Sequence, residues 1–306
     1  TAYKKGLGEF WYRNKLDPAQ SPQFPIDQDA KPRVWRFPRK DRALVGMGGG
    51  KDSIVLAEMF KQISYDITSF VVETEQGSSL IDSVAEEIGA PILRVRRILD
   101  KKLFDSSAMH DGHIPVSMIY AVIGMLVAVL YDYAYVAIGN ARSSDYGNTL
   151  YKKARINHQW SKTEEFEALF QQYARMVLTP DVTYFSPLRA FYEMRIAEML
   201  AKYPKYHSLF SSCNRNFRIK KNASTQRWCG VCPKCAYTYL LFAAFLPKKK
   251  LVRIFGEDLL MKETLFSTYK DILGFGAMKP FDCVGTFEET QAALYVARRR
   301  FSHSPV

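Results

Sequence analysis

The sequence predicts an α/β protein with a doubly wound parallel sheet, followed by a small C-terminal region that carries a four-cysteine site. Three observations support this prediction. Short apolar runs alternate with helical periodicity between residues 42 and 201, three glycines separate the first predicted strand from the first helix, and four cysteines lie between residues 213 and 235. Strands that alternate with helices imply parallel pairing, with helices on both faces of the sheet.

The first half of the alternation starts at Ala43. Residues 43–47 are an apolar run that ends at glycines, and residues 53–62 then place apolar side chains at helical spacing. The order repeats with a strand at 67–72, a helix at 79–88 and a strand at 92–95. Residues 1–40, rich in proline and aromatic residues, show no sustained period, and we expect an irregular lead-in or the tail of a missing N-terminal domain.

The second half contains the uncharged run 116–131, a predicted helix that leads into a strand at 135–138. The run has 16 residues, whereas a bilayer requires about 20, so we expect a buried helix and no membrane span. A helix at 161–176, a strand at 182–185 and a helix at 191–201 complete the domain, which we place at 41–205 before a C-terminal region at 206–306. Ser161-x-x-Glu164 is a capping-box pattern, so Ser161 is expected to cap its helix.

Composition and charge set the class of protein. The 306 residues are 47% hydrophobic and 24% charged, which is typical of a globular chain, and no signal-peptide pattern is present, so we expect a cytoplasmic protein. The formal net charge of +12 suits polyphosphate ligands. A nucleic-acid partner is compatible with this charge but is not required by it.

The loop after the first predicted strand is a candidate phosphate site. Ligands of such sheets bind beyond the carboxyl ends of the strands, which places residues 48–53, 73–77 and 139–148 on one rim. Glycines let backbone amides approach a phosphate, and the helix N-terminus adds N–H donors. Lys51 and Ser53 would add further donors, and Asp52 could hold Mg²⁺. The loop departs from the Walker A pattern, because Asp52 stands where that pattern has Ser or Thr.

This loop resembles the Ser-Gly-Gly-x-Asp-Ser signature of the N-type ATP pyrophosphatase, or PP-loop, superfamily, with Gly48 in place of the leading serine. The resemblance implies that the chain cleaves ATP to AMP and pyrophosphate while it adenylates a substrate oxygen. It assigns ATP binding to the loop and to a neighbouring rim residue: Gly48, Gly49, Gly50, Lys51, Asp52, Ser53 and Glu73. The superfamily's Lys-x-Glu pair reads Glu193-x-Arg195 here, so a phosphate role for that pair is in doubt.

The cysteine pattern predicts a metal site. Four thiolates suit tetrahedral zinc, and a cytoplasmic chain favours metal over disulfides. An iron–sulfur cluster uses the same ligands, so spacing alone leaves it open. We expect a structural zinc held by Cys213, Cys229, Cys232 and Cys235. PP-loop enzymes that make 7-cyano-7-deazaguanine carry a similar arrangement.

Three polar stretches are candidates for the substrate side: 139–148, 157–162 and 279–286. Together with the loop and the cysteines, they resemble the UDP-N-acetylmuramoyl-L-alanyl-L-glutamate epimerase family, which also carries a further N-terminal region. The resemblance implies ATP-dependent epimerisation of the terminal L-glutamate through an acyl-adenylate, in peptidoglycan synthesis. We expect a small-molecule substrate and no membrane partner, while a nucleic-acid partner is left open. A nucleobase-modifying PP-loop enzyme, either deazaguanine-forming or tRNA-modifying, is the alternative.

The residues proposed for the chemistry come from these stretches. Asn140, Arg142 and Lys162 are candidate substrate or adenylate contacts. The catalytic candidates are Asp52 for magnesium placement and, as acid or base, Asp145, His158 and Cys283. The sequence leaves other roles open, because His158 also fits a surface histidine and Cys283 also fits a small buried hydrophobe.

Overall fold

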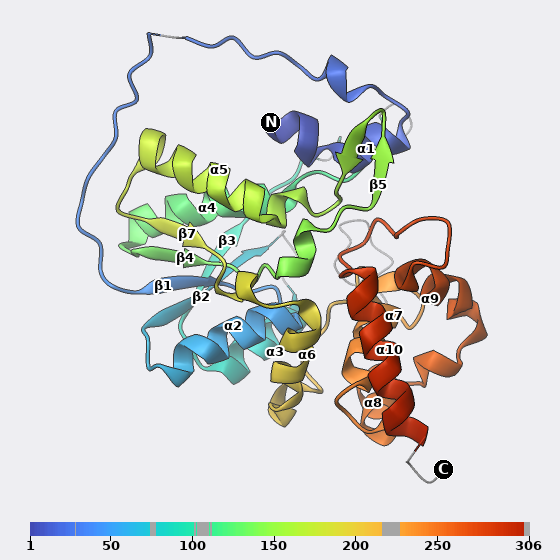
Figure 1. Cartoon of the computed structure of the whole chain (residues 1–306). Helices are drawn as coiled ribbons and strands as arrows, with labels where there is room; N and C mark the ends of the chain where they lie inside the picture. Colours follow the sequence, from blue (N-terminus) through green and yellow to red (C-terminus); the bar gives the residue numbers. More distant parts are fainter. Residues whose placement is uncertain are drawn as a thin grey trace.

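The centre of the molecule is a five-stranded parallel sheet with strand order β3-β2-β1-β4-β7 (Figure 1). A computed structural model describes residues 1–302 apart from 28, 74–77, 101, 103–109, 111 and 216–226. The strands are β1 (Ala43–Gly46), β2 (Ile67–Glu73), β3 (Ile92–Arg96), β4 (Tyr135–Ala137) and β7 (Thr183–Phe185). All four neighbouring pairs are parallel, with Val45 of β1 in register with Ser69 of β2 and Ala137 of β4. The predicted α/β fold class is confirmed.

Helices cover both faces of this sheet (Figure 1). One face carries α2 (Lys51–Gln62), α3 (Ser79–Ile88) and α6 (Glu193–Ala201), and the other carries α4 (Val116–Tyr131) and α5 (Glu164–Tyr173). Successive residues of a strand point to opposite faces. Val45 therefore packs in the core with α2 and α6, whereas Leu44 packs with α4 and α5.

Helix α4 has the predicted bounds but is only half buried. Ala121 and Met125 lie in the core, whereas the side chains of Val122 and Leu126 are 49% and 58% exposed. The expectation of a buried helix therefore holds for one side only, because the helix packs on the sheet with that side. Within the described residues, no helix has the length and apolar character needed to cross a membrane.

The start of α5 differs from the sequence prediction. Thr163 is the N-cap, and its hydroxyl accepts a hydrogen bond from the Phe166 backbone N–H at 3.2 Å. Ser161 instead lies in a 3-10 turn that ends at Lys162, so the capping-box assignment to Ser161 was wrong. The turn delays the helix by two residues and brings the next hydroxyl to the capping position.

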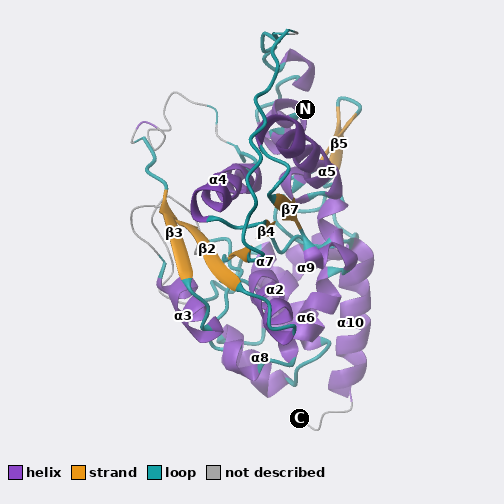
Figure 2. Ribbon diagram, turned by 90° about the vertical axis from the view of Figure 1, so that its left-hand side faces the viewer, coloured by secondary structure: helices purple, strands orange, loops and turns teal. Residues whose placement is uncertain are grey.

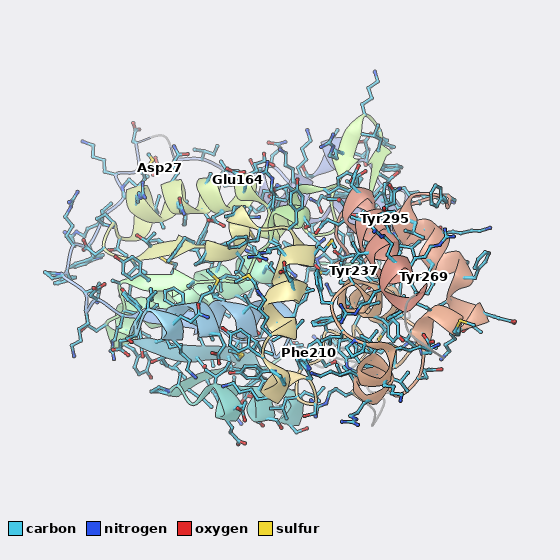
Figure 3. All side chains as sticks on the ribbon, turned by 60° about the horizontal axis from the view of Figure 1, so that its bottom comes forward. Asp27, Glu164, Phe210, Tyr237, Tyr269 and Tyr295 are labelled. Carbon is cyan, nitrogen blue, oxygen red and sulfur yellow. The ribbon has the colours of Figure 1, made fainter. Side chains whose placement is uncertain are left out.

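The C-terminal helices pack against the α2 and α6 side of the sheet. They are α7 (Pro233–Ala243), α8 (Lys248–Phe255), α9 (Phe266–Leu273) and α10 (Phe287–Ser302). Helix α7 is buried along its whole length, and one continuous core joins it to α2 and α6. Figure 3 shows Tyr237 and Tyr269 among these helices. The interior is continuous between the sheet and the cysteine region.

The first residues fold onto the α4 and α5 side. Helix α1 (Gly8–Arg13) lies next to a hairpin of β5 (Thr149–Tyr151) and β6 (Ala154–Ile156) (Figure 1), and Figure 2 shows the N-terminus on the side of α5 and β5. Residues 2–13 are thus helical rather than irregular, and Glu9 and Trp11 are buried. Short turns of 3-10 or π helix complete the described structure at Ala2–Gly6, Pro18–Gln20, Arg142–Asp145, Trp160–Lys162, Ala174–Leu178, Pro187–Ala190, Pro204–Tyr206, Leu259–Met261 and Glu263–Leu265.

Candidate functional site

The glycine loop lies between β1 and α2, next to the point where the strand order reverses between β1 and β4. Gly49 has φ +72°, which favours glycine, and Gly50 is the N-cap of α2. A Cβ on Gly48 would meet no atom within 4 Å, so the loop opens to free space there. Backbone N–H groups at a helix N-terminus beside open space form an anion site.

Two of the three predicted rim segments meet at this loop. A Cβ on Gly139, two residues after β4, would lie 3.0 Å from the backbone of Asp52, so a larger residue would require the loop to shift. Glu73 lies at the end of β2, where its carboxylate is 3.1 Å from Arg94. Residues 74–77 of the third segment lie outside the described residues.

A buried ion-pair network stands behind the loop. Lys51 is fully buried, and its Nζ lies 2.6 Å from Asp52 Oδ1 and 3.0 Å from Glu193 Oε2. Lys234 Nζ lies 3.6 Å from the same Glu193 oxygen. Burial would lower the pKa of Lys51, but Asp52 and Glu193 outweigh it and raise that pKa. Glu193 therefore anchors the loop lysine, whereas Arg195 is an exposed partner of Glu198.

Cys283 lies on the other side of Lys234. The Lys234 ammonium donates a hydrogen bond to the Cys283 carbonyl, and Lys162 Nζ lies 3.4 Å from the Cys283 sulfur. Burial alone would raise the pKa of this thiol. Lys162, His158 and Lys234 outweigh burial and lower the Cys283 pKa to about 5. Cys283 is therefore a thiolate at neutral pH.

His158 is the second member of this group, and Glu9 from α1 is the third. Nδ1 of His158 is hydrogen-bonded to the Glu9 carboxylate, and the ring contacts that of His113, tilted by 40° with centroids 4.1 Å apart. Burial would lower the pKa of His158, but Cys283 and Glu9 raise it to about 9. Burial and the neighbouring His158 lower the His113 pKa to about 4, so His113 is neutral. The arrangement is a thiolate–imidazolium pair supported by a carboxylate.

Asn148 fixes the geometry of this pair. Its Oδ1 accepts a hydrogen bond from the His158 backbone N–H at 2.8 Å, and its Nδ2 donates to the Pro280 carbonyl at 2.7 Å. One side chain thus ties the loop of His158 to the segment of Cys283. The β5–β6 hairpin lies between Asn148 and Asn157 in sequence and returns the chain to Ser144, whose carbonyl accepts a hydrogen bond from the Asn157 side chain.

The remaining predicted residues lie around this centre. Asn140 is buried and donates to Ser186 Oγ at 3.2 Å, and Arg142 is exposed with its guanidinium 5.6 Å from the Tyr192 ring centroid. Asp145 accepts a hydrogen bond from the Glu164 backbone N–H at the start of α5. Of the three acid or base candidates, His158 and Cys283 lie together and Asp145 lies apart from them.

An open groove of about 870 Å³ lies beside the centre. Tyr146 and Thr286 line it near the segment of Cys283, and four cationic side chains line it further out. These are Lys4, Lys5, Arg142 and Arg155. The carboxylates of Asp145, Glu164 and Glu165 also line the groove, which therefore has the size of a ligand pocket and a small excess of positive charge.

The four cysteines form a compact cluster. Their sulfur atoms all lie within 4.8 Å of one another, with 3.4 Å between Cys232 and Cys235 and 3.7 Å between Cys229 and Cys235. Zinc–sulfur bonds of about 2.3 Å place the sulfurs of a tetrahedral site about 3.8 Å apart. The cluster could therefore hold a metal ion, as predicted for Cys213 and its three partners.

Donor atoms of Glu9, His113 and His158 also lie within 4.8 Å of one another. These three residues could hold a metal ion, and in this structure the His158 ring is hydrogen-bonded to the Glu9 carboxylate.

Sequence reasoning missed Glu9, His113, Lys234 and Lys279. Glu9 and His113 lie in polar or irregular stretches far from His158 in sequence, and no local spacing links them. One indication for Lys234 was present in the sequence: it lies between Cys232 and Cys235, so its position is fixed by the turn that brings these two cysteines together. Lys279 is the first residue of the polar stretch 279–286, but nothing in the sequence indicated that its side chain is buried.

Comparisons with known proteins relate both the sheet domain and the cysteine region to one family. Residues 1–187 match the family described as the MurL N-terminal domain, and residues 209–305 match the MurL C-terminal domain. The chain is 39% identical over 302 residues to UDP-N-acetyl-alpha-D-muramoyl-L-alanyl-L-glutamate epimerase of Xanthomonas oryzae pv. oryzae, covering 98% of this chain and 66% of that protein. A protein of the same name from Micromonospora sp. is 37% identical over 295 residues, covering 95% of this chain and 65% of its own length.

The chain thus spans about two thirds of the length of these relatives. Among solved structures, a predicted subunit of tRNA methyltransferase from Methanocaldococcus jannaschii shares 17% identity, with a TM-score of 0.31 over 51% of this chain and 73% of that chain. This structural similarity is too low to support an argument.

Proposed function

The chain belongs to the MurL family, and on that premise we propose that it carries the epimerase activity for which its relatives are named. The terminal L-glutamate of UDP-N-acetylmuramoyl-L-alanyl-L-glutamate would become D-glutamate, in the cytoplasmic part of peptidoglycan synthesis. ATP would activate the glutamyl carboxylate as an acyl-adenylate, with AMP and pyrophosphate as products. The observation that carries the proposal is the Cys283 thiolate, which Lys234 and Glu193 connect to Lys51 of the glycine loop.

Activation solves the main chemical difficulty of the reaction. The α-proton beside a free carboxylate is very weakly acidic, because its removal would place a second negative charge next to the first. Adenylation removes the carboxylate charge and lets the carbonyl accept the electrons of the carbanion. ATP cleavage and proton abstraction therefore belong at neighbouring positions, as the glycine loop and Cys283 are.

The loop would hold the phosphates of ATP. The open space at Gly48 and the N-terminus of α2 suit an anion, and Lys51 is held in place by Glu193. The Asp52 side chain is 29% exposed and would hold Mg²⁺, which neutralises charge on the departing pyrophosphate. Burial of Lys51 keeps its charge fixed in a poorly solvated site, where electrostatic stabilisation is strongest.

Cys283 would take the α-proton from one face of the glutamyl carbon. A thiolate with a pKa of about 5 is present at neutral pH and can accept the α-proton, and the adjacent imidazolium of His158 stabilises the thiolate and can donate a proton. Glu9 is then a positioning residue that holds the His158 ring. Reprotonation from the opposite face completes the inversion, and water releases the product carboxylate and AMP.

The groove would hold the nucleotide-sugar part of the substrate. Its four cations, among them the predicted Arg142, outnumber its three carboxylates and would contact the diphosphate of the ligand. Its inner wall at Tyr146 and Thr286 leads towards Cys283, so a peptide that extends from the sugar would reach the thiolate with its last residue. We also propose that the metal in the cysteine cluster is zinc with a structural role, since four thiolates leave no open coordination position.

The test is a reaction in deuterium oxide with the full-length protein, ATP, Mg²⁺ and the L-glutamyl substrate. We expect AMP and pyrophosphate, a D-glutamyl product, and deuterium at the glutamyl α-carbon. Asp52→Asn should lower AMP formation by at least about 100-fold, because the carboxylate that holds the metal is lost. The matched control is Asp27→Asn, an exposed position that Figure 3 shows far from the C-terminal helices and that should keep full activity. Formation of ADP and phosphate, or a product without α-deuterium, would contradict the proposal.

A further inference from the structure

Three lysines are buried in the described part of the chain: Lys51, Lys234 and Lys279. Lys51 and Lys234 share the Glu193 carboxylate as an ion-pair partner. Lys279 is 2% exposed and has no described carboxylate at ion-pair distance. Its Nζ donates one hydrogen bond, to the Tyr146 carbonyl at 3.2 Å, and lies 4.7 Å from the centroid of the Tyr146 ring.

An ammonium group without a counter-ion is expensive to bury. Burial lowers the pKa of Lys279 to about 8, and Glu193, Glu289 and Cys283 offset only part of this effect. The side chain therefore still carries its charge at neutral pH, with two of its three donors unused by described groups. A buried ammonium group that is charged and has unused donors favours binding of an anion.

The position of Lys279 indicates which anion. It precedes Cys283 by four residues on the same segment, which Asn148 holds through the Pro280 carbonyl. The charges of Glu193, Glu289 and Cys283 all act on Lys279, in that order. Lys279 lies on the segment of the thiolate, and its hydrogen bond goes to Tyr146 and not to the phosphate loop. Tyr146 contacts Lys279 and also lines the groove, so Lys279 lies one side chain away from the groove.

We propose that Lys279 binds the side-chain carboxylate of the terminal glutamate and so makes the enzyme specific for an acidic residue. The inference rests on the proposed function. A glutamyl residue brings two carboxylates to the site: the α-carboxylate, which is activated at the loop, and the γ-carboxylate, two methylenes beyond the carbon that Cys283 deprotonates. The γ-carboxylate needs a cation on the Cys283 side, and Lys279 is the buried cation there without an anionic partner among the described residues.

The test compares two substrates that differ only in the terminal residue, glutamate or glutamine, with AMP release as the readout. The wild type should favour glutamate by at least about 100-fold in kcat/KM, since the amide leaves the buried charge unpaired. Lys279→Met should lower kcat/KM for glutamate by roughly 100-fold and change that for glutamine by less than about threefold. Lys279→Gln, which removes the charge but can still donate to Tyr146, should give the same loss of discrimination, and Lys279→Arg should retain it.

Lys202→Met, an exposed lysine at the end of α6, is the matched control and should behave as the wild type. Failure of the wild type to use the glutamyl substrate would overturn the proposed function. A wild type that is active, with Lys279 variants that still discriminate or that lose both substrates equally, would overturn only the inference about Lys279.

Discussion

Cys283 differs chemically from the other cysteines. Two of the clustered thiols, Cys232 and Cys235, have raised pKa values, with contact to Cys213 as the largest cause. The Cys283 pKa is lowered to about 5 because cations surround it and outweigh its burial. The charges around a cysteine thus decide whether its side chain is a neutral thiol or a basic thiolate.

This difference predicts the pH dependence of alkylation at Cys283. The thiolate reacts with iodoacetamide, so the rate should fall as pH drops through the Cys283 pKa, with a midpoint near 5. Lys162→Met removes the cation at 3.4 Å and should move the midpoint upward by roughly two units. Cys283→Ser gives the background rate from other thiols. A wild-type midpoint near the ordinary cysteine value would refute the assignment.

At the scale of secondary-structure elements, much of the α/β domain could be predicted from the sequence. The five strands and the helices α2 to α6 followed from apolar periodicity, because each buries one or both faces against the sheet. Errors arose where local chemistry decided the outcome, as at Thr163, where a 3-10 turn displaced the cap. Glu9 could not be placed, since only the fold brings α1 to His158.

The junction of β4 with the phosphate loop gives a test at this scale. Gly139→Ala would place a methyl group 3.0 Å from the Asp52 backbone, so the loop must shift. We expect loss of about 1–3 kcal/mol in the free energy of unfolding and at least a tenfold loss of AMP formation. Gly48→Ala, where no atom lies within 4 Å, is the control for stability and should leave the unfolding midpoint unchanged. Normal activity in Gly139→Ala would argue against close packing there.

At the scale of the whole molecule, the cysteine cluster is connected to both halves of the candidate site. The Ser211 backbone N–H donates to the Gly49 carbonyl at 3.1 Å, two residues before Cys213. Lys234, between Cys232 and Cys235, contacts Glu193 and the Cys283 carbonyl. A metal in the cluster would therefore fix the glycine loop and the thiolate together, although it lies outside the reaction itself.

We predict about one zinc per chain, measured by elemental analysis, and joint loss of structure and function when it is removed. Cys232→Ser should lower zinc content, lower the thermal midpoint by at least about 10 °C, and abolish AMP formation, because binding of a structural zinc contributes many kcal/mol to folding. Cys283→Ser separates the two roles: it should keep the zinc and the thermal midpoint but lose epimerisation by at least about 100-fold. A metal-free protein with unchanged thermal stability would show that the cluster does not organise the site. Iron in place of zinc would keep the structural role and change only the identity of the metal, since the four thiolates that hold either one are the same.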